Sequence, residues 1–199
     1  KVNLGYERNK VPNPSPGVGG PCLSKDPYIL EDIFSKFNLD CSVTSSARRI
    51  NEAAPKLIFQ RCKNHLNKLG KRLVDEKIFI IGFAFKGEPI TSDLRESTTV
   101  WFVDYLQKKG VKNIFGYDPV VSREEIEKFN IKFSPPETGF KGASAVFVMN
   151  NHRSYLDMDI NSLLNIMDKP ALFYDGWNMF QSRDLNNIPD VSYMGMGIG

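Results

Sequence analysis

The most constraining feature of this 199-residue sequence is a series of short, wholly apolar segments separated by segments with helical spacing. Residues 78–81, 145–149 and 171–174 have no polar face, which is typical of strands buried on both sides. Between such runs, apolar residues recur three and four positions apart, the period of an α-helix. Because strands joined by single helices need crossover connections, the pattern predicts a doubly wound parallel sheet, an α/β fold.

The predicted elements divide the chain at a charged junction, residues 70–76. Downstream, strands are predicted over 77–82, 113–117, 131–133, 145–149, 171–174 and 191–194, with helices over 97–109, 122–129 and 157–167. Upstream, residues 1–12 are predicted to be irregular and helices are predicted over 28–36 and 45–69, the second with a kink or a break at Pro55. Its apolar stripe is expected to face the core: Ile50, Ala53, Leu57, Ile58, Cys62 and Leu66.

A loop rich in glycine and proline, residues 14–28, carries the first candidate for chemistry. Its cysteine, Cys22, is followed by Lys25 and Asp26 and then by a predicted helix start. A thiol beside a cation and a carboxylate has what a nucleophilic cysteine needs: neighbours that favour the thiolate, and a group that can move a proton. The alternative is an ordinary linker loop with a small, buried apolar cysteine.

Composition limits the classes of protein and of partner that this chain can belong to or bind. The hydrophobic content of 41% and charged content of 25% are those of a globular protein, and the net charge of +3 does not point to nucleic acid or a membrane surface. The three cysteines are widely spaced, with no metal-ligand or disulfide pattern, which favours a reducing, cytoplasmic location and no metal. No apolar run reaches membrane-spanning length.

Several motifs, in order along the chain, resemble one family. Residues 17–26, Gly-Val-Gly-Gly-Pro-Cys-Leu-Ser-Lys-Asp, are similar to the active-site loop of the nucleotide-sugar 6-dehydrogenases, the UDP-glucose/GDP-mannose dehydrogenase family. Gly82–Gly87, Asp93–Ser97 and Tyr117–Pro119 resemble three further signatures of that family. Weaker matches follow at 150–155 and 175–178. The resemblance implies that residues 71–199 form a Rossmann-like UDP-sugar-binding domain, and that residues 1–70 carry the cysteine loop and part of a central helical dimerisation region.

The same resemblance implies roles for individual residues. It makes Cys22 the nucleophile and Asp26 its assistant in water or proton steps, and it places Lys25 and Arg95 at an NAD cofactor. The residues expected to contact the UDP-sugar are Gly17, Val18, Gly19, Phe85 and Lys86.

Other readings stay open for several polar residues. Lys86 is otherwise an ordinary surface lysine, and Asp93 with Glu96 can cap a helix start. Arg8 is either solvated or reaches a neighbouring subunit's substrate. For His152 and for residues 117–119 a structural role is favoured, and Trp177 stands where many relatives have an arginine.

The implied activity is NAD-dependent oxidation of the C6 alcohol of a UDP-sugar to a carboxylate, through a thiohemiacetal and a thioester on Cys22. The sugar is expected to be UDP-glucose or a UDP-N-acetyl-aminosugar, and the full-length protein a homodimer or higher homo-oligomer. No Gly-x-Gly-x-x-Gly follows a strand and Lys1 opens the chain, so an upstream NAD-binding domain is expected and the isolated polypeptide is predicted to be inactive. The alternative is a nucleotide-sugar-binding module with an incidental cysteine.

Overall fold

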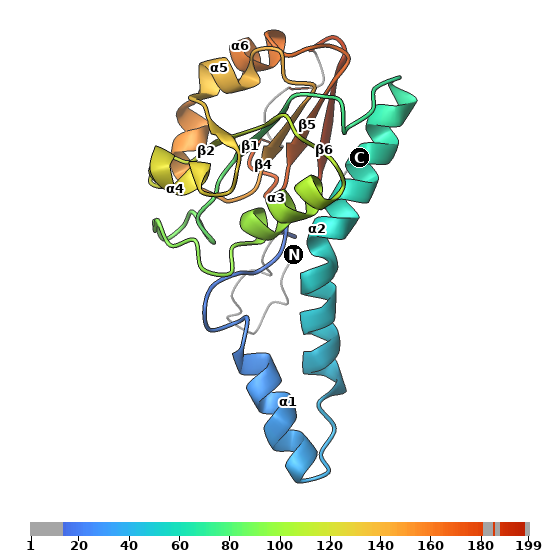
Figure 1. The fold of residues 1–199 in the computed structure, drawn as a ribbon, viewed down its shortest axis with the longest axis vertical. Helices are drawn as coiled ribbons and strands as arrows, with labels where there is room; N and C mark the ends of the chain where they lie inside the picture. Colours follow the sequence, from blue (N-terminus) through green and yellow to red (C-terminus); the bar gives the residue numbers. More distant parts are fainter. Residues whose placement is uncertain (1–13, 181–184, 186–187, 198–199) are drawn as a thin grey trace, which may run out of the picture.

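A six-stranded sheet, parallel throughout, organises the chain (Figure 1). The computed structural model describes residues 14–180, 185 and 188–197; Arg8 and the loop predicted over 1–12 lie outside them. The strand order is β3-β2-β1-β4-β5-β6, which confirms the predicted Rossmann-like α/β fold. The strands are β1 (Ile78–Ile81), β2 (Ile114–Tyr117), β3 (Lys132–Phe133), β4 (Ala145–Val148), β5 (Ala171–Asp175) and β6 (Val191–Gly195).

The helices agree with the prediction in the long elements and differ in the short ones. They are α1 (Asp26–Lys36), α2 (Ser42–Lys68), α3 (Thr98–Lys108), α4 (Arg123–Glu127), α5 (Pro136–Phe140), the 3-10 helix η1 (Arg153–Asp157) and α6 (Ile160–Asn165). The helix predicted over 157–167 is present but shorter, as α6, because Met158 is extended and the Asp159 side chain caps the helix at its N-terminus. The 3-10 helix η1 was not predicted. Helix α5 was not predicted, since five residues are too few to show a helical period.

Strand β1 illustrates why three of the predicted strands have no polar face. Ile78 and Ile80 pack into a core that includes residues of α2 and α3, whereas Phe79 and Ile81 pack into a second core with residues of α5 and α6. All four side chains are completely buried. Helices therefore cover both faces of the sheet (Figure 1), and an apolar side chain is needed at every position of this strand.

Helix α2 runs through Pro55 as one 27-residue element, so the predicted break is wrong. Proline removes one helical hydrogen bond, but the C-terminal half of the helix is held by burial of Ile58, Cys62 and Leu66 in the sheet core. The apolar stripe is only partly buried, because Ile50 is 69% exposed and Leu57 is 56% exposed. The N-terminal half of α2 therefore extends beyond the core.

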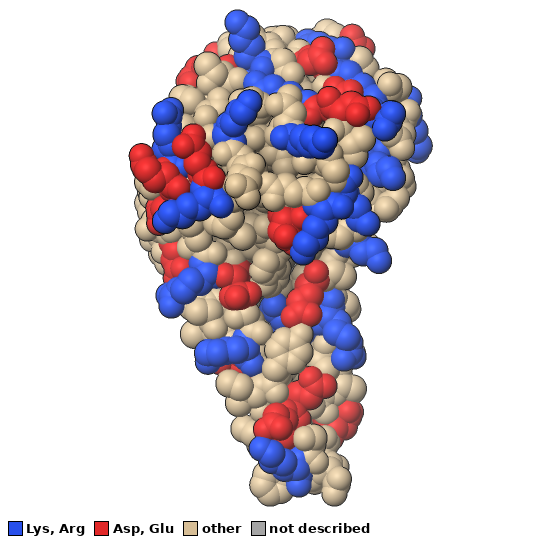
Figure 2. Space-filling model, viewed as in Figure 1, with Lys and Arg blue, Asp and Glu red and all other residues tan. Residues whose placement is uncertain are grey.

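Helix α1 and the N-terminal half of α2 form a hairpin that projects away from the sheet, as a narrow extension at the bottom of Figures 1 and 2. None of the residues of α1 is buried. The loop that carries Cys22 lies where this hairpin meets the sheet domain. In the described part of the chain, no helix combines the length and the apolar content needed to cross a bilayer.

Candidate functional site

The carboxyl ends of β1 and β4 form the edge at which the site is built. These two strands are neighbours, and the chain crosses from β1 toward β2 on one side and from β4 toward β5 on the other. Ligands of open parallel sheets bind in the crevice that such a switch point leaves. Here the segments that follow the two strands are tied together, because Asn151 Oδ1 accepts hydrogen bonds from the backbone N–H of Gly87 (2.9 Å) and of Glu88 (3.2 Å).

A buried carboxylate holds the segment after β1 in place. Asp118, at the end of β2, is 3% exposed, and its Oδ2 accepts from the N–H of Phe83 (2.7 Å) and of Ala84 (3.0 Å). The amide of Asn150, after β4, donates to the same oxygen at 3.2 Å. The structural role favoured for Asp118 is thereby confirmed, and the loop that carries Lys86 leaves the sheet in a defined direction.

The glycines of the cysteine loop permit close contact with the segment before α3. Gly20 has a φ of +97°, a conformation that side chains disfavour, and its N–H donates to the carbonyl of Glu96 at 3.3 Å. A Cβ atom at Gly19 would overlap that same carbonyl. The loop therefore approaches the sheet domain by its backbone, which only residues without side chains allow.

Cys22 lies in a turn that leads directly into helix α1. Its carbonyl accepts from the N–H of Lys25 (3.1 Å) and of Asp26 (2.9 Å), the first residue of the helix. The cysteine is exposed, so the alternative of a buried apolar cysteine is wrong for this residue. The Lys25 ammonium pairs with the Asp26 carboxylate at 2.6 Å, and both side chains are more than half exposed.

A cavity of about 500 Å³ joins the cysteine loop to the sheet edge. Among the residues that line it are Gly19, Cys22, Phe85, Lys86 and Arg95. The thiol and the cation predicted at residues 22 and 86 therefore face one space, although 64 positions separate them in the chain. Four residues of the predicted site do not line this cavity: Gly17, Val18, Lys25 and Asp26.

Two cations lie near the thiol. The pKa of Arg95 is raised, chiefly by its hydrogen bonds to the Asp93 carboxylate and also by the negative charge of a Cys22 thiolate. The pKa of Lys25 is raised in the same way, first by the hydrogen bond to Asp26 and last by the Cys22 charge. Both cations therefore lie close enough to Cys22 to interact with a charge on its sulfur.

The capping box predicted for Asp93 and Glu96 is wrong. Glu96 has a φ of +53°, outside the helical region, and α3 is capped by Ser97, whose Oγ accepts from the N–H of Thr99. Asp93 instead binds the Arg95 guanidinium through both oxygens, at 2.6 to 3.0 Å. The ion pair orients Arg95 beside the cavity.

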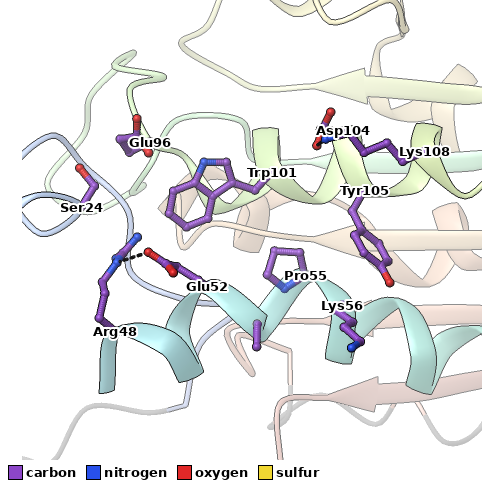
Figure 3. Close-up of a pocket in the computed structure, with 11 residues that line it drawn as sticks. Ser24, Arg48, Glu52, Pro55, Lys56, Glu96, Trp101, Asp104, Tyr105 and Lys108 are labelled. Atoms are coloured by element: carbon purple, nitrogen blue, oxygen red, sulfur yellow. Dashed lines mark hydrogen bonds and ion pairs between the residues drawn. The ribbon is translucent and has the colours of Figure 1, made fainter. Parts of the chain in front are cut away.

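Two polar residues of α2 that contact the cysteine loop were not singled out by the sequence. Asn51 bonds the backbone of Val18, and Arg48 bonds the carbonyl of Leu23. The only sequence signal of these two residues is that they are polar and have the same helical spacing as the buried apolar residues of α2. Helical periodicity does not indicate that a polar residue contacts a distant loop. Figure 3 shows Arg48 and Glu52 on α2, in a second cavity of about 520 Å³ that also includes Trp101 of α3 and Ser24 of the loop.

The remaining candidates have structural contacts. His152 caps η1, with Nδ1 accepting from the N–H of Ser154, so the structural role favoured for it is confirmed. Trp177 donates from Nε1 to the Met149 carbonyl at 3.0 Å. Within the described residues, no group of three or more His, Cys, Asp or Glu side chains is placed to hold a metal ion.

Comparison with known proteins agrees with this arrangement. Residues 79–182 match the UDP binding domain of the UDP-glucose/GDP-mannose dehydrogenase family, and residues 4–53 match its central domain. The chain belongs to this family. The two matched regions carry Lys86 and Cys22 respectively, so the cavity lies between segments that the family model assigns to different domains.

Individual members of the family also match most of this chain. A UDP-N-acetyl-D-mannosamine dehydrogenase of Pyrococcus horikoshii is 30% identical over 98% of this chain, and a UDP-glucose 6-dehydrogenase of Caenorhabditis elegans is 26% identical over 93% of it. The chain spans 41% of the length of each of these relatives. The structure of a UDP-D-ManNAc dehydrogenase from Pyrococcus horikoshii covers 96% of the chain, with a TM-score of 0.77 and 29% identity, and the chain covers 41% of it.

Proposed function

We propose that this chain supplies the UDP-sugar-binding domain and the nucleophilic cysteine of an NAD-dependent UDP-sugar 6-dehydrogenase. One observation carries the proposal: Cys22 and Lys86, from two distant segments, line the same cavity. In this proposal residues 71–199 bind the nucleotide-sugar. Residues 1–70 present the thiol and belong to a central helical region through which the complete protein forms a homodimer or higher homo-oligomer in the cytoplasm.

Substrate binding is assigned to the sheet edge and the glycine loop. The Lys86 ammonium, half-buried and 5.2 Å from the centre of the Phe85 ring, is a compact charge suited to a diphosphate. The family resemblance assigns Gly17, Val18 and Gly19 to the sugar, and of these three Gly19 lines the cavity. A UDP-sugar bound in this way would extend from Lys86 toward Cys22.

The thiol then acts on the sugar at the aldehyde stage. The Cys22 thiolate adds to the C6 carbonyl carbon, a sulfur–carbon bond forms, and the carbonyl oxygen takes up a proton. The resulting thiohemiacetal places a hydride-donating carbon on the enzyme, and loss of that hydride and of the hydroxyl proton leaves a thioester. Water adds to the thioester and the carbon–sulfur bond breaks. The carboxylate product is released, and Cys22 is regenerated as a thiolate.

Asp26 is proposed to assist the hydrolytic step. Its carboxylate lies at the start of α1, one turn after Cys22, and is more than half exposed, so it can accept a proton from the attacking water. Lys25 pairs with this carboxylate at 2.6 Å and would orient it.

NAD, when bound, supplies the oxidant for both alcohol and thiohemiacetal oxidation by accepting hydride from C6. Two residues could bind its anionic phosphates, because Arg95 and Lys25 are exposed cations. Both lie close enough to Cys22 to interact electrostatically with it, and so lie near the site of reaction. The glycine-rich phosphate cradle of a dinucleotide fold has no counterpart in this sequence. We therefore expect no steady NADH formation when the 199-residue polypeptide alone is supplied with NAD and a UDP-sugar.

The binding part of the proposal is tested by calorimetric titration with UDP, UDP-glucose, UDP-N-acetylmannosamine and GDP-mannose. Lys86→Ala should weaken UDP binding by about tenfold, which corresponds to ~1.4 kcal/mol and is the order of one charge-assisted contact. Lys112→Ala is the matched control. This exposed lysine precedes β2, at the amino ends of the strands, whereas Lys86 follows the carboxyl end of β1. Equal UDP affinity of the two variants would contradict the assignment.

The alternative function, a nucleotide-sugar-binding module with an incidental cysteine, is favoured by the positions of Lys25 and Asp26, which do not line the cavity that Cys22 lines. Alkylation of Cys22 by iodoacetamide separates the two. If the thiol faces the sugar, saturating UDP-glucose or UDP-N-acetylmannosamine slows the alkylation of Cys22. In the alternative, the ligand binds with the same affinity and the alkylation rate does not change.

A further inference from the structure

Helix α2 connects the sheet core to the cysteine loop through one stripe of side chains. Arg48, Asn51, Pro55, Ile58 and Cys62 are three or four positions apart and so lie on the same face of the helix. The last two are buried in the core beside β1 and β5 residues, at 1% and 0% exposure. Because α2 is continuous, the first two are held at a set position relative to the sheet.

Asn51 makes a two-point contact with the loop. Its Oδ1 accepts from the Val18 N–H at 2.7 Å, and its Nδ2 donates to the Val18 carbonyl at 2.8 Å. Both bonds go to the backbone of one residue, so they fix its orientation as well as its position. Val18 itself has an exposed side chain and depends on this backbone contact for its placement.

Arg48 makes the second contact, on the other side of Cys22. Its Nη1 donates to the Leu23 carbonyl at 3.3 Å, and its Nε pairs with Glu52 at 2.9 Å. The side chain is only 5% exposed and its guanidinium carbon lies 5.3 Å from the centre of the Trp101 ring. Figure 3 shows Arg48 between the loop residue Ser24 and the helix, with its bond to Glu52 marked.

We propose that Asn51 and Arg48 are positioning residues for Cys22, which hold the loop on either side of the thiol so that the sulfur faces the substrate cavity. Together with the bond from Gly20 to the Glu96 carbonyl, they secure the loop at residues 18, 20 and 23. Glycine and proline residues give this loop little regular structure of its own, so its geometry has to come from such external contacts. The inference rests on the proposed function, since it concerns the same thiol.

The test is protection of Cys22 from iodoacetamide by a saturating UDP-sugar, measured by peptide mass mapping on the complete chain. Asn51→Ala should lower the protection factor by about tenfold, or ~1.4 kcal/mol, the order of what two neutral hydrogen bonds contribute. Arg48→Met should lower it in the same direction. Asn51→Asp keeps an acceptor for the Val18 N–H and should fall between Asn51→Ala and wild type.

Two internal controls separate positioning from unfolding. Asn64→Ala removes an exposed asparagine from the same helix and should leave the protection of Cys22 unchanged. Cys62 reports global unfolding, because burial raises its pKa to about 12 and makes its thiol unreactive in the folded chain. Cys62 should stay unmodified in every variant used.

The possible results are distinguishable. If the UDP-sugar binds but does not protect Cys22 in the wild-type chain, the proposed function fails. If wild-type Cys22 is protected and Asn51→Ala retains that protection with Cys62 unmodified, the positioning role is wrong. Loss of UDP affinity in Asn51→Ala, with Cys62 still unmodified, would also overturn the inference, because the residue would then act on the nucleotide site and not on the thiol.

Discussion

Replacement of Asp118 by alanine is expected to be the most damaging single change at the sheet edge. The carboxylate accepts from the buried N–H groups of Phe83, Ala84 and Val121, at 2.7, 3.0 and 3.2 Å. Alanine would leave these three donors without an acceptor in a site that is 3% exposed in the native protein. At ~1 kcal/mol for each unsatisfied group, the free energy of unfolding should fall by about 3 kcal/mol.

This loss is a large share of the total, because domains are typically stable by only ~5–15 kcal/mol. With a urea m-value of ~2 kcal/mol/M, the midpoint of unfolding should move down by about 1.5 M. Circular dichroism follows the transition. UDP affinity, measured at low temperature where the variant remains folded, should also fall, since the same carboxylate holds the segment that leads to Lys86.

Asp104→Ala provides the matched control. This aspartate is 58% exposed and forms an i,i+4 ion pair with Lys108 at 2.6 Å. Exposed pairs of this kind contribute ~0.5 kcal/mol or less, so its midpoint should stay near wild type. A midpoint for Asp118→Ala equal to that of the control would refute the reasoning, since it would mean that the buried N–H groups lose nothing with their acceptor.

Two further predictions concern stability. Gly139→Ala should lower the free energy of unfolding by ~1–3 kcal/mol, because the added Cβ would overlap the buried ring of Phe79, and an unchanged urea midpoint would contradict this. The pKa of Asp168 is lowered in the folded protein, mainly by the hydrogen bond that its carboxylate accepts from Lys71. The ionised carboxylate therefore stabilises the fold above the unfolded pKa of ~3.9, and this stabilisation is lost as the pH falls through the lower folded pKa. Wild type should therefore exceed Asp168→Asn in urea midpoint at pH 7, with the difference narrowing below about pH 4; a difference independent of pH would refute the assignment.

The long elements and the sheet were predictable because they follow from local patterns. Each of the six predicted strands is present. Strands β1, β4 and β5 were the clearest, since a run without a polar face is typical of a strand buried between two layers. The short elements were not predictable to the same degree. The helix predicted over 157–167 begins only at Ile160 because of the cap at Asp159, a hydrogen bond that leaves little trace in periodicity.

The errors at the site have the same origin. Asp93 and Glu96 have the spacing of a capping box, yet Glu96 takes a left-handed conformation, in which its carbonyl accepts from Gly20 of the cysteine loop. The prediction considered only neighbours in sequence, whereas the conformation accompanies a contact 76 positions away. A kink or a break was likewise predicted at Pro55, and the break is absent because burial against the sheet keeps the helix continuous.

The sequence alone determined which segments form strands, which family the motifs resemble, and which residue types are available for chemistry. These properties are local, because strand burial and motif identity are encoded in consecutive residues. Only the tertiary structure decided that Cys22 and Lys86 share a cavity, and that Asn51 and Arg48 secure the loop between helix and sheet. These contacts join segments far apart in the chain, and their geometry depends on the packing of α2 against the core, which no single segment specifies.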